Sequence, residues 1–236
     1  MYRPGTKKFY KLAAAEPAGS GYTVRLDGRA VRTPAGRNLT VPGKRLAEAL
    51  AVEWNAQPET LDPAGMSMTA LACTAIDRIG TERAAIESAL LRHAETDLLC
   101  YRAENPHDLA SRQYEVWQPL VDWAGETHGI ALVVTNGILP VPQPQAALDA
   151  ASNAIRALDD WDLTALSGIA AASGSLIVAL ALTAGRIDAA QAFEAAQLDE
   201  DYQNEKWGTV EEAKRRRDAL RGDIQAAADF LALKRS

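Results

Sequence analysis

The chain has 236 residues, of which 47% are hydrophobic and 24% are charged, and its formal net charge is -6. This composition is typical of a globular protein with room for one large domain or two unequal ones. An acidic molecule has no overall electrostatic attraction to a phosphate backbone. We therefore expect no nucleic-acid partner.

The two cysteines, Cys73 and Cys100, lie in apolar, helix-like sequence without the spacing of a zinc or redox site. We expect both to be reduced core residues. An uncharged stretch at 163–185 has the length of a membrane span, but it is rich in Ala, Ser and Gly and lacks an aromatic belt. It predicts a helix that is buried on all sides, so an integral membrane protein is not expected.

The first forty residues predict a β-hairpin. YTVRL and RAVRT flank an Asp-Gly pair at 27–28, which suits a two-residue turn with positive φ. That register would place Val24 opposite Val31 and Tyr22 opposite Thr33. Two further strand-like segments would complete a small, twisted antiparallel sheet with a basic exposed face: residues 7–13 and 37–42.

From Gly43 onward the apolar residues recur at helical spacing, as Leu46, Leu50 and Trp54 do. Seven further helices are expected, at 67–79, 81–99, 108–126, 145–158, 163–184, 189–205 and 210–233. Between them, residues 130–144 predict a strand or an extended segment. The sequence therefore predicts an α+β fold, with a small β-rich domain at 1–43 followed by a larger, mainly α-helical domain at 44–236.

Two helix starts carry the residues of a capping box, in which the first side chain and the fourth satisfy each other's backbone donors. The pairs are Asp188 with Gln191 and Thr209 with Glu212. Gly208 stands where a glycine often ends a helix. The sequence therefore predicts a tight corner between the last two helices.

A search for catalytic motifs finds no phosphate-binding glycine loop after a strand, no HExxH and no nucleophile elbow. We expect no catalytic residue, metal or cofactor. The nearest candidate is HAETD, where His93 and Asp97 at i, i+4 on a helix, together with Glu95, could bind a metal or share a proton. An enzyme of unknown type that uses this cluster and the C-terminal acids is the alternative function.

The most unusual stretch is LDEDYQNEKWGTVEEAKRRR at 198–217. Glu200, Gln203 and Trp207 share one helix face, and acids near a helix C-terminus oppose the macrodipole, so local stability does not explain them. With Asp199 and Glu211 they would form a rigid acidic corner around a large aromatic anchor. Such a corner suits a protein-binding surface, and a solvated acidic helix end is the alternative.

Five segments together resemble a known family. In chain order they are EW at 53–54, MSMTALACTAIDRI at 66–79, TDLLCYRA at 96–103, GSLIVALAL at 174–182 and DEDYQNEKWGTVEEA at 199–213. This set resembles the ATP12 chaperone family, the assembly chaperones that bind the catalytic-sector alpha subunit of the F-type ATP synthase. The resemblance runs from about residue 7 to residue 233.

The resemblance implies a non-enzymatic chaperone that binds the unassembled alpha subunit and shields its beta-facing surface. We expect the acidic corner with Trp207 to make the main contact, with Glu53 and Trp54 second. The chain is expected to act as a monomer. Because the N-terminal segment lacks the features of a signal or transit peptide, we expect a bacterial cytoplasmic protein, or a matrix protein if a presequence has been removed.

Overall fold

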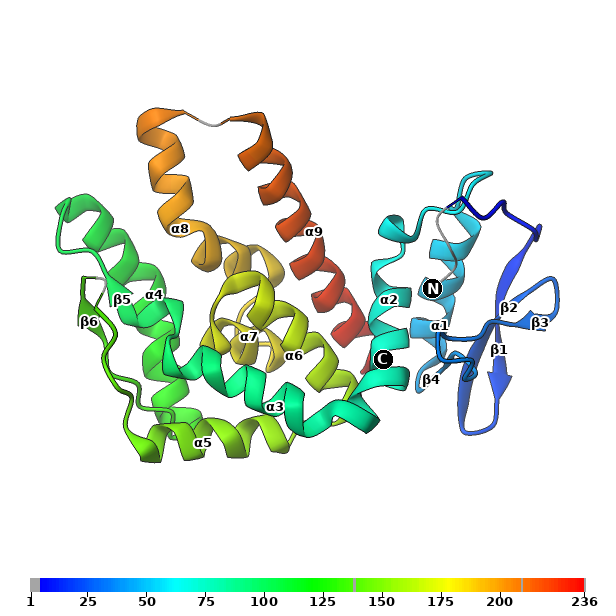
Figure 1. Cartoon of the computed structure of the whole chain (residues 1–236), viewed down its shortest axis with the longest axis horizontal. Coiled ribbons are helices and arrows are strands. Elements are labelled where there is room, and N and C mark those ends of the chain that lie inside the picture. Colours follow the sequence, from blue (N-terminus) through cyan, green and yellow to red (C-terminus); the bar gives the residue numbers. More distant parts are fainter. Residues whose placement is uncertain (1–4, 138, 209, 236) are drawn as a thin grey trace.

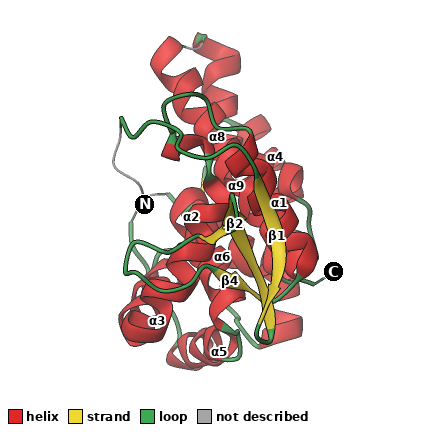
Figure 2. Ribbon diagram, turned by 90° about the vertical axis from the view of Figure 1, so that its right-hand side faces the viewer, coloured by secondary structure: helices red, strands yellow, loops and turns green. Residues whose placement is uncertain are grey.

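The computed structural model describes residues 5–137, 139–208 and 210–235. A small antiparallel sheet lies at one end of the molecule, and most of the helices lie at the other (Figure 1). Figure 2 views the molecule from the sheet end, with the helices behind the strands. The predicted α+β class, with a small N-terminal sheet before a mainly helical region, is confirmed.

The sheet is built around one central strand. Its strands are β1 (Ala13–Ala18), β2 (Gly21–Leu26), β3 (Arg29–Ala30) and β4 (Thr40–Val41), and both β3 and β4 pair with the same edge of β2. The predicted turn is present, with positive φ at Asp27 and Gly28. The N–H of Val31 donates to the carbonyl of Val24, so this half of the predicted register is also confirmed.

The predicted first strand is wrong. Residues 7–12 form no strand and have one isolated bridge, between Lys7 and Thr60, and the edge strand β1 starts at Ala13. This strand contains Pro17, which cannot donate a hydrogen bond and is tolerated because it lies on an edge.

The predicted pairing of Tyr22 with Thr33 is also wrong, because Tyr22 pairs with Val41 of β4. The chain turns away after Val31, and the hydroxyl of Thr33 donates to Asp77 at 2.7 Å. A hydrogen bond to Asp77, which lies 44 residues further along the chain, therefore holds Thr33 away from a position opposite Tyr22.

The first helix, α1 (Lys44–Asn55), packs on β1 and β2 and buries the predicted stripe of Leu46, Leu50 and Trp54. It also contacts α2 (Ser67–Thr74) and the C-terminal helix α9 (Glu211–Lys234). The division of the chain at residue 43 stays a prediction.

A turn of π-helix (Ala75–Ile79) joins α2 to α3 (Gly80–Glu95), so the helix predicted at 67–79 is present. The predicted end of the next helix at residue 99 is wrong. Thr96 leaves the helical conformation, Asp97 is extended, and a short 3₁₀ turn (Leu98–Cys100) follows.

The remaining helices are α4 (His107–His128), α5 (Gln145–Arg156), α6 (Asp160–Ser173), α7 (Leu176–Thr183) and α8 (Ala189–Trp207). Every residue of α7 is buried, and this helix lies in the middle of the helical region (Figure 1). None of the helices in the described residues has both the length and the apolar character that crossing a membrane requires.

The single helix predicted at 163–184 is in fact two. Gly174 adopts the left-handed conformation with φ of 72°, and the hydroxyl of Ser175 caps the new helix at Val178. The carboxylate of Asp97 accepts a hydrogen bond from that hydroxyl at 2.7 Å and another from the N–H of Ile177. The buried carboxylate of Asp97, which comes from a distant segment of the chain, therefore stabilises the break between α6 and α7.

A two-stranded parallel sheet pairs β5 (Tyr101–Arg102) with β6 (Thr135–Asn136). The strand or extended segment predicted within 130–144 is therefore present. The side chain of Gln143 donates to the carbonyl of Val133 and accepts from its N–H. These two hydrogen bonds satisfy backbone polar groups of the extended segment outside the short strand β6.

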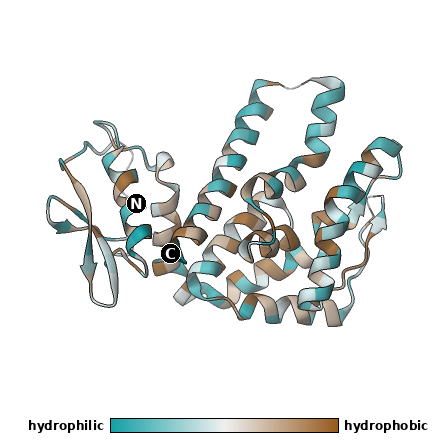
Figure 3. Ribbon diagram, turned by 180° about the vertical axis from the view of Figure 1, so that it is seen from behind, coloured by the Kyte–Doolittle hydropathy of each residue, from teal (hydrophilic) through white to brown (hydrophobic). Residues whose placement is uncertain are grey.

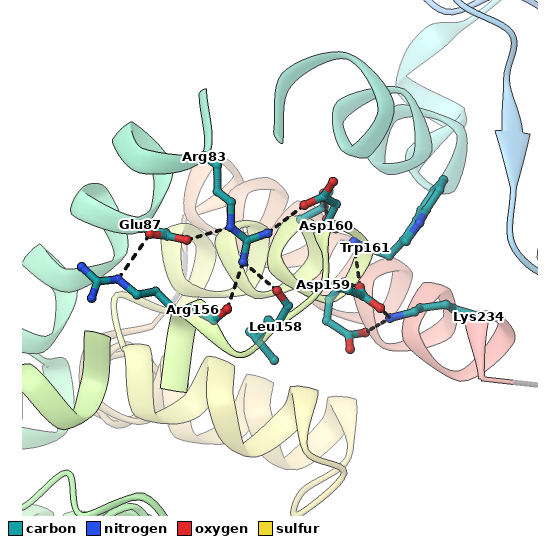
Figure 4. A network of polar contacts seen from close by, with 10 residues as sticks. Arg83, Glu87, Arg156, Leu158, Asp159, Asp160, Trp161 and Lys234 are labelled. Carbon is teal, nitrogen blue, oxygen red and sulfur yellow. Dashed lines mark hydrogen bonds and ion pairs between the residues drawn. The ribbon is translucent and has the colours of Figure 1, made fainter. Parts of the chain in front are cut away.

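Two cations, one on α3 and one on α9, join parts of the helical region by binding acidic side chains (Figure 4). Arg83 of α3 binds four groups: the carboxylates of Glu87 and Asp160 and the carbonyls of Arg156 and Leu158. Lys234, at the end of α9, forms ion pairs with Asp159 and Asp162. These contacts fix the start of α6 to α3 and α9.

Candidate functional site

The outer halves of α8 and α9 form a projection that we call the arm, residues 199–208 and 210–221. Figure 1 shows both helices rising from the body and meeting at their outer ends. The base of α8 has the predicted capping box between Asp188 and Gln191. Gly208 follows the helix with φ of 82°, as its predicted role requires.

The second predicted capping box pairs Thr209 with Glu212, and Thr209 lies outside the described residues. The next helix begins at Glu211, one residue after Val210, whose side chain supplies no cap. The short connection between α8 and α9 nevertheless confirms the predicted corner.

The inner side of the arm is attached to the body through α4. Asp199 accepts a hydrogen bond from the side-chain amide of Gln113 at 2.7 Å, and burial raises the pKa of this carboxyl. The hydroxyl of Tyr202 donates to Asp108 at 2.8 Å, and Tyr202 is buried as its helical position predicts. Asp199 therefore has a structural role in addition to its predicted place in the acidic corner.

Ion pairs reinforce the same attachment. Asp201 receives two hydrogen bonds of 2.7 Å from Arg217 of α9, so the two helices of the arm are joined to each other. Glu205 pairs with Arg112 of α4 at 2.8 Å. The arm is therefore held in one orientation by groups on its inner side.

The outer side of the arm has different properties. Glu200, Gln203 and Trp207 are all exposed, and no hydrogen bond or ion pair joins them to another described side chain. Trp207 is 78% exposed, and Val210 beside the corner is 69% exposed. Glu211 is exposed at the start of α9, so four of the five predicted corner residues face solvent, and one of the four is the large aromatic residue Trp207.

The basic run that follows the corner has no predicted role. In the structure, Lys214, Arg215 and Arg216 are exposed on α9, whereas the guanidinium groups of Arg217 and Arg221 lie over the ring of Phe193. The arm thus presents acids on α8 and cations on α9, and hydrophilic residues dominate its outer half (Figure 3). The KRRR run itself was the signal that could have shown this.

The second predicted contact pair lies elsewhere, in the N-terminal part of the molecule. The carboxylate of Glu53 accepts hydrogen bonds from the backbone of Met68 and Thr69 and from the Thr69 hydroxyl, all within 2.8 Å, and so holds the start of α2. Trp54 is 3% exposed, and its carbonyl accepts from the hydroxyl of Tyr10 at 2.6 Å. A contact role for Glu53 and Trp54 stays a prediction.

The cluster of the alternative function is not assembled. Because α3 ends at Glu95, Asp97 is not one helical turn from His93, and the predicted i, i+4 pair is wrong. Glu95 is exposed, whereas Asp97 is fully buried against Ser175. Across residues 5–137, 139–208 and 210–235, no three His, Cys, Asp or Glu side chains gather as metal ligands.

Comparison with known proteins decides the family. The model of the ATP12 chaperone protein family matches residues 7–125, which is half of the chain. The crystal structure of Atp12 from Paracoccus denitrificans is 36% identical, with 97% of this chain and 98% of that one covered and a TM-score of 0.89. The chain belongs to the ATP12 chaperone family.

Two further relatives agree with this assignment. The Atu1473 protein of Agrobacterium tumefaciens is 37% identical over 96% of this chain and 85% of its own, with a TM-score of 0.90. The mitochondrial protein atp12 of Schizosaccharomyces pombe is 27% identical over 89% of this chain and 77% of its own. The resemblance seen in the sequence is confirmed, and the chain is an ATP12-type chaperone of ATP synthase assembly.

Proposed function

We propose that this protein binds the unassembled alpha subunit of the ATP synthase catalytic sector through the outer side of the arm. It shields the beta-facing surface of that subunit until the beta subunit replaces it. The observation that supports the arm is Trp207, whose ring is 78% exposed at the end of the helix face that carries the exposed Glu200 and Gln203, with Glu211 exposed at the start of α9. Large aromatic anchors surrounded by polar groups are typical of protein-binding hot spots.

The rigidity of the arm favours this role. Its inner acids are joined to α4 and α9, so the outer side chains stand on a fixed framework. A surface that is already ordered loses less conformational entropy on binding, which leaves more of the contact energy for affinity.

The polarity of the arm favours a partner that must later leave. Charged groups accelerate association and set orientation, while a single exposed tryptophan gives a small apolar centre. An interface of this kind is weaker than an obligate one and depends on salt. Both properties suit a chaperone that a second subunit displaces.

Glu53 and Trp54 are secondary candidates in this proposal. Since Glu53 holds α2 and Trp54 is buried, their contribution would be indirect, by keeping α1 and α2 together. We also propose that the chain acts as a monomer in the cytoplasm of a bacterium. The higher identity to the Paracoccus and Agrobacterium proteins than to the fungal mitochondrial ones supports a bacterial origin.

The proposal is tested by capture of purified alpha and beta subunits on the immobilised protein. We expect alpha to be retained and beta not. The double variant Glu200→Lys, Glu211→Lys should weaken alpha binding about tenfold or more, because two exposed charges at the contact change sign. Its melting temperature should stay within about 2 °C, as for most exposed substitutions.

A matched control is Glu95→Lys with Glu115→Lys, which makes the same change in net charge at exposed positions of α3 and α4. Alpha binding should survive in this control. Equal loss in both double variants would show that net charge and not the arm matters. Capture of beta alone, or of neither subunit, would refute the proposed client.

A further inference from the structure

A surface pocket of about 450 Å³ is lined by residues of α4, β5 and β6 and of the segments next to these strands, and none of its lining residues belongs to the arm. We call it the Arg102 pocket. With Arg102, its lining includes Glu104, Ala110, Tyr114, Gln118, Val134 and Asn136. Arg102 belongs to the TDLLCYRA segment, whose first half supplies the buried Asp97.

Arg102 is a buried cation with unused donors. The residue is only 7% exposed, and its Nε donates to the carbonyl of Leu99 at 3.3 Å. Its Nη2 is buried and has no hydrogen-bond partner in the described part of the chain, and Arg102 takes part in none of the ion pairs found there. A buried charge without a counter-charge is destabilising, so an anion that binds in the pocket from solvent would stabilise Arg102.

The backbone on both sides of Arg102 is fixed. Arg102 pairs with Asn136 in the parallel sheet, and its carbonyl accepts from the N–H of Gly137 at 2.8 Å. The N–H of Ala103 donates to the side chain of Gln113, also at 2.8 Å. The guanidinium is therefore held in place before any ligand arrives, which lowers the entropic cost of binding.

The surroundings select a singly charged, planar anion. The pocket offers one guanidinium, and Glu104 on its lining opposes a second negative charge. A guanidinium binds a carboxylate through two parallel hydrogen bonds. The ring of Tyr114 lies 6.0 Å from the guanidinium and is 63% exposed, and Ala110 and Val134 add apolar surface for the carbon chain that carries the carboxylate.

We propose that the Arg102 pocket is a binding site for a carboxylate group. The guanidinium binds its two oxygens, and the ring of Tyr114 covers the adjoining carbon chain. The site is separate from the arm and does not depend on the identity of the client that the arm binds. It gives the TDLLCYRA segment two roles, since Asp97 braces the core and Arg102 receives a ligand.

The test is a titration of the whole protein with butyrate, a singly charged carboxylate, at constant ionic strength, followed by thermal unfolding. We expect a saturable rise in melting temperature of roughly 2–4 °C, because a ligand that binds only the folded state stabilises it. Arg102→Gln should abolish the rise. Inorganic phosphate should raise the melting temperature no more than chloride does.

The matched control is Arg92→Gln, which removes the same charge from an exposed position on α3 and should keep the response to butyrate. Without ligand, Arg102→Gln should melt no lower than the wild type, because it removes an unpaired buried charge. If Arg102 were purely structural, Arg102→Gln would instead lower the melting temperature and leave the butyrate response of the remaining folded protein unchanged.

Tyr114→Ala is a second variant at an exposed position, and it should weaken butyrate binding several-fold without loss of folding. N-acetylglutamate amide and N-acetylalanine distinguish an acidic side chain from a chain terminus as the source of the carboxylate. No saturable response to any of these carboxylates, an equal response in Arg102→Gln, or an equal response to phosphate would overturn the proposal.

Discussion

Two acidic stretches of this chain look alike in the sequence and behave differently in the structure. In DDWD, Asp159 and Asp162 both pair with Lys234, and Asp160 pairs with Arg83. In DED at the arm, the middle residue Glu200 has no ion pair among the described residues, whereas its neighbours are engaged on the inner side. A run of acids therefore indicates a site only where the rest of the fold leaves a member unpaired.

The cations that neutralise the first stretch come from far along the chain. Arg83 and Lys234 lie 77 and 75 residues from the acids they bind. Asp97 is an extreme case of the same structural use, since it is fully buried and accepts hydrogen bonds from Ser175 and from the backbone of Leu99 and Ile177. The acids of DDWD and Asp97 are therefore structural, whereas Glu200 is exposed, and each of these residues can be substituted separately.

Asp97→Ala should have the largest effect on stability. It leaves the Ser175 hydroxyl and two backbone N–H groups buried without an acceptor, so we expect a loss of about 3 kcal/mol in the free energy of unfolding. Urea denaturation measures it. Ser175→Ala, which removes one donor, should cost roughly 1 kcal/mol, and a loss below this for Asp97→Ala would mean that the break between α6 and α7 needs no acid.

Arg83→Ala should cost less, about 1–2 kcal/mol. The side chain is 31% exposed, so solvent screens its ion pairs, but its loss also leaves two carbonyls of the α5–α6 connection without their donor. The loss should shrink at high salt. Arg92→Ala on the same helix is the control and should change stability by less than about 0.5 kcal/mol.

Asp97 should also make stability depend on pH. Burial raises the pKa of this carboxyl from 3.8 to about 6, partly opposed by its hydrogen bonds. Between these values the folded state holds the proton more tightly than the unfolded state, so the contribution of Asp97 to stability falls as the pH rises from about 4 to 6. The slope is at most about 1.4 kcal/mol per pH unit.

The measurement is the difference in unfolding free energy between the wild type and Asp97→Asn across that range. The asparagine variant does not titrate, so other groups cancel from the difference. A difference that rises with pH would mean that the hydrogen bonds outweigh burial and lower the pKa of Asp97.

The smallest expected losses of stability distinguish two neighbouring acids of the arm, Asp201 and Glu200. Asp201→Asn weakens the ion pair with Arg217, whose side chains are 33% and 28% exposed, and should cost about 0.5–1 kcal/mol. Glu200→Gln should change the unfolding free energy by less than about 0.5 kcal/mol. Equal losses in the two variants, measured by urea denaturation, would remove the distinction between the inner and outer sides of the arm.

Features that depend on a few neighbouring residues could be predicted from the sequence. The Asp-Gly turn, the stripe of α1, the Asp188 capping box and the glycine corner all follow from local geometry. The helical spacing also placed Glu200, Gln203 and Trp207 on one exposed face. Predictions failed where a distant group intervened, as when Thr33 turned toward Asp77 and when Asp97 divided the helix at Gly174.

The sequence alone therefore determined the small sheet, the helical remainder, the exposed corner and the family resemblance, because periodicity, caps and motifs lie within short segments. Only the tertiary structure decided which polar groups are satisfied, since their partners lie up to 98 residues away. In the folded chain Glu53, Asp97 and Asp199 accept internal hydrogen bonds, whereas Trp207 is exposed and Arg102 is buried without an ion pair among the described residues. The energy of a buried charge depends on all of its neighbours, and those neighbours exist only in the folded chain.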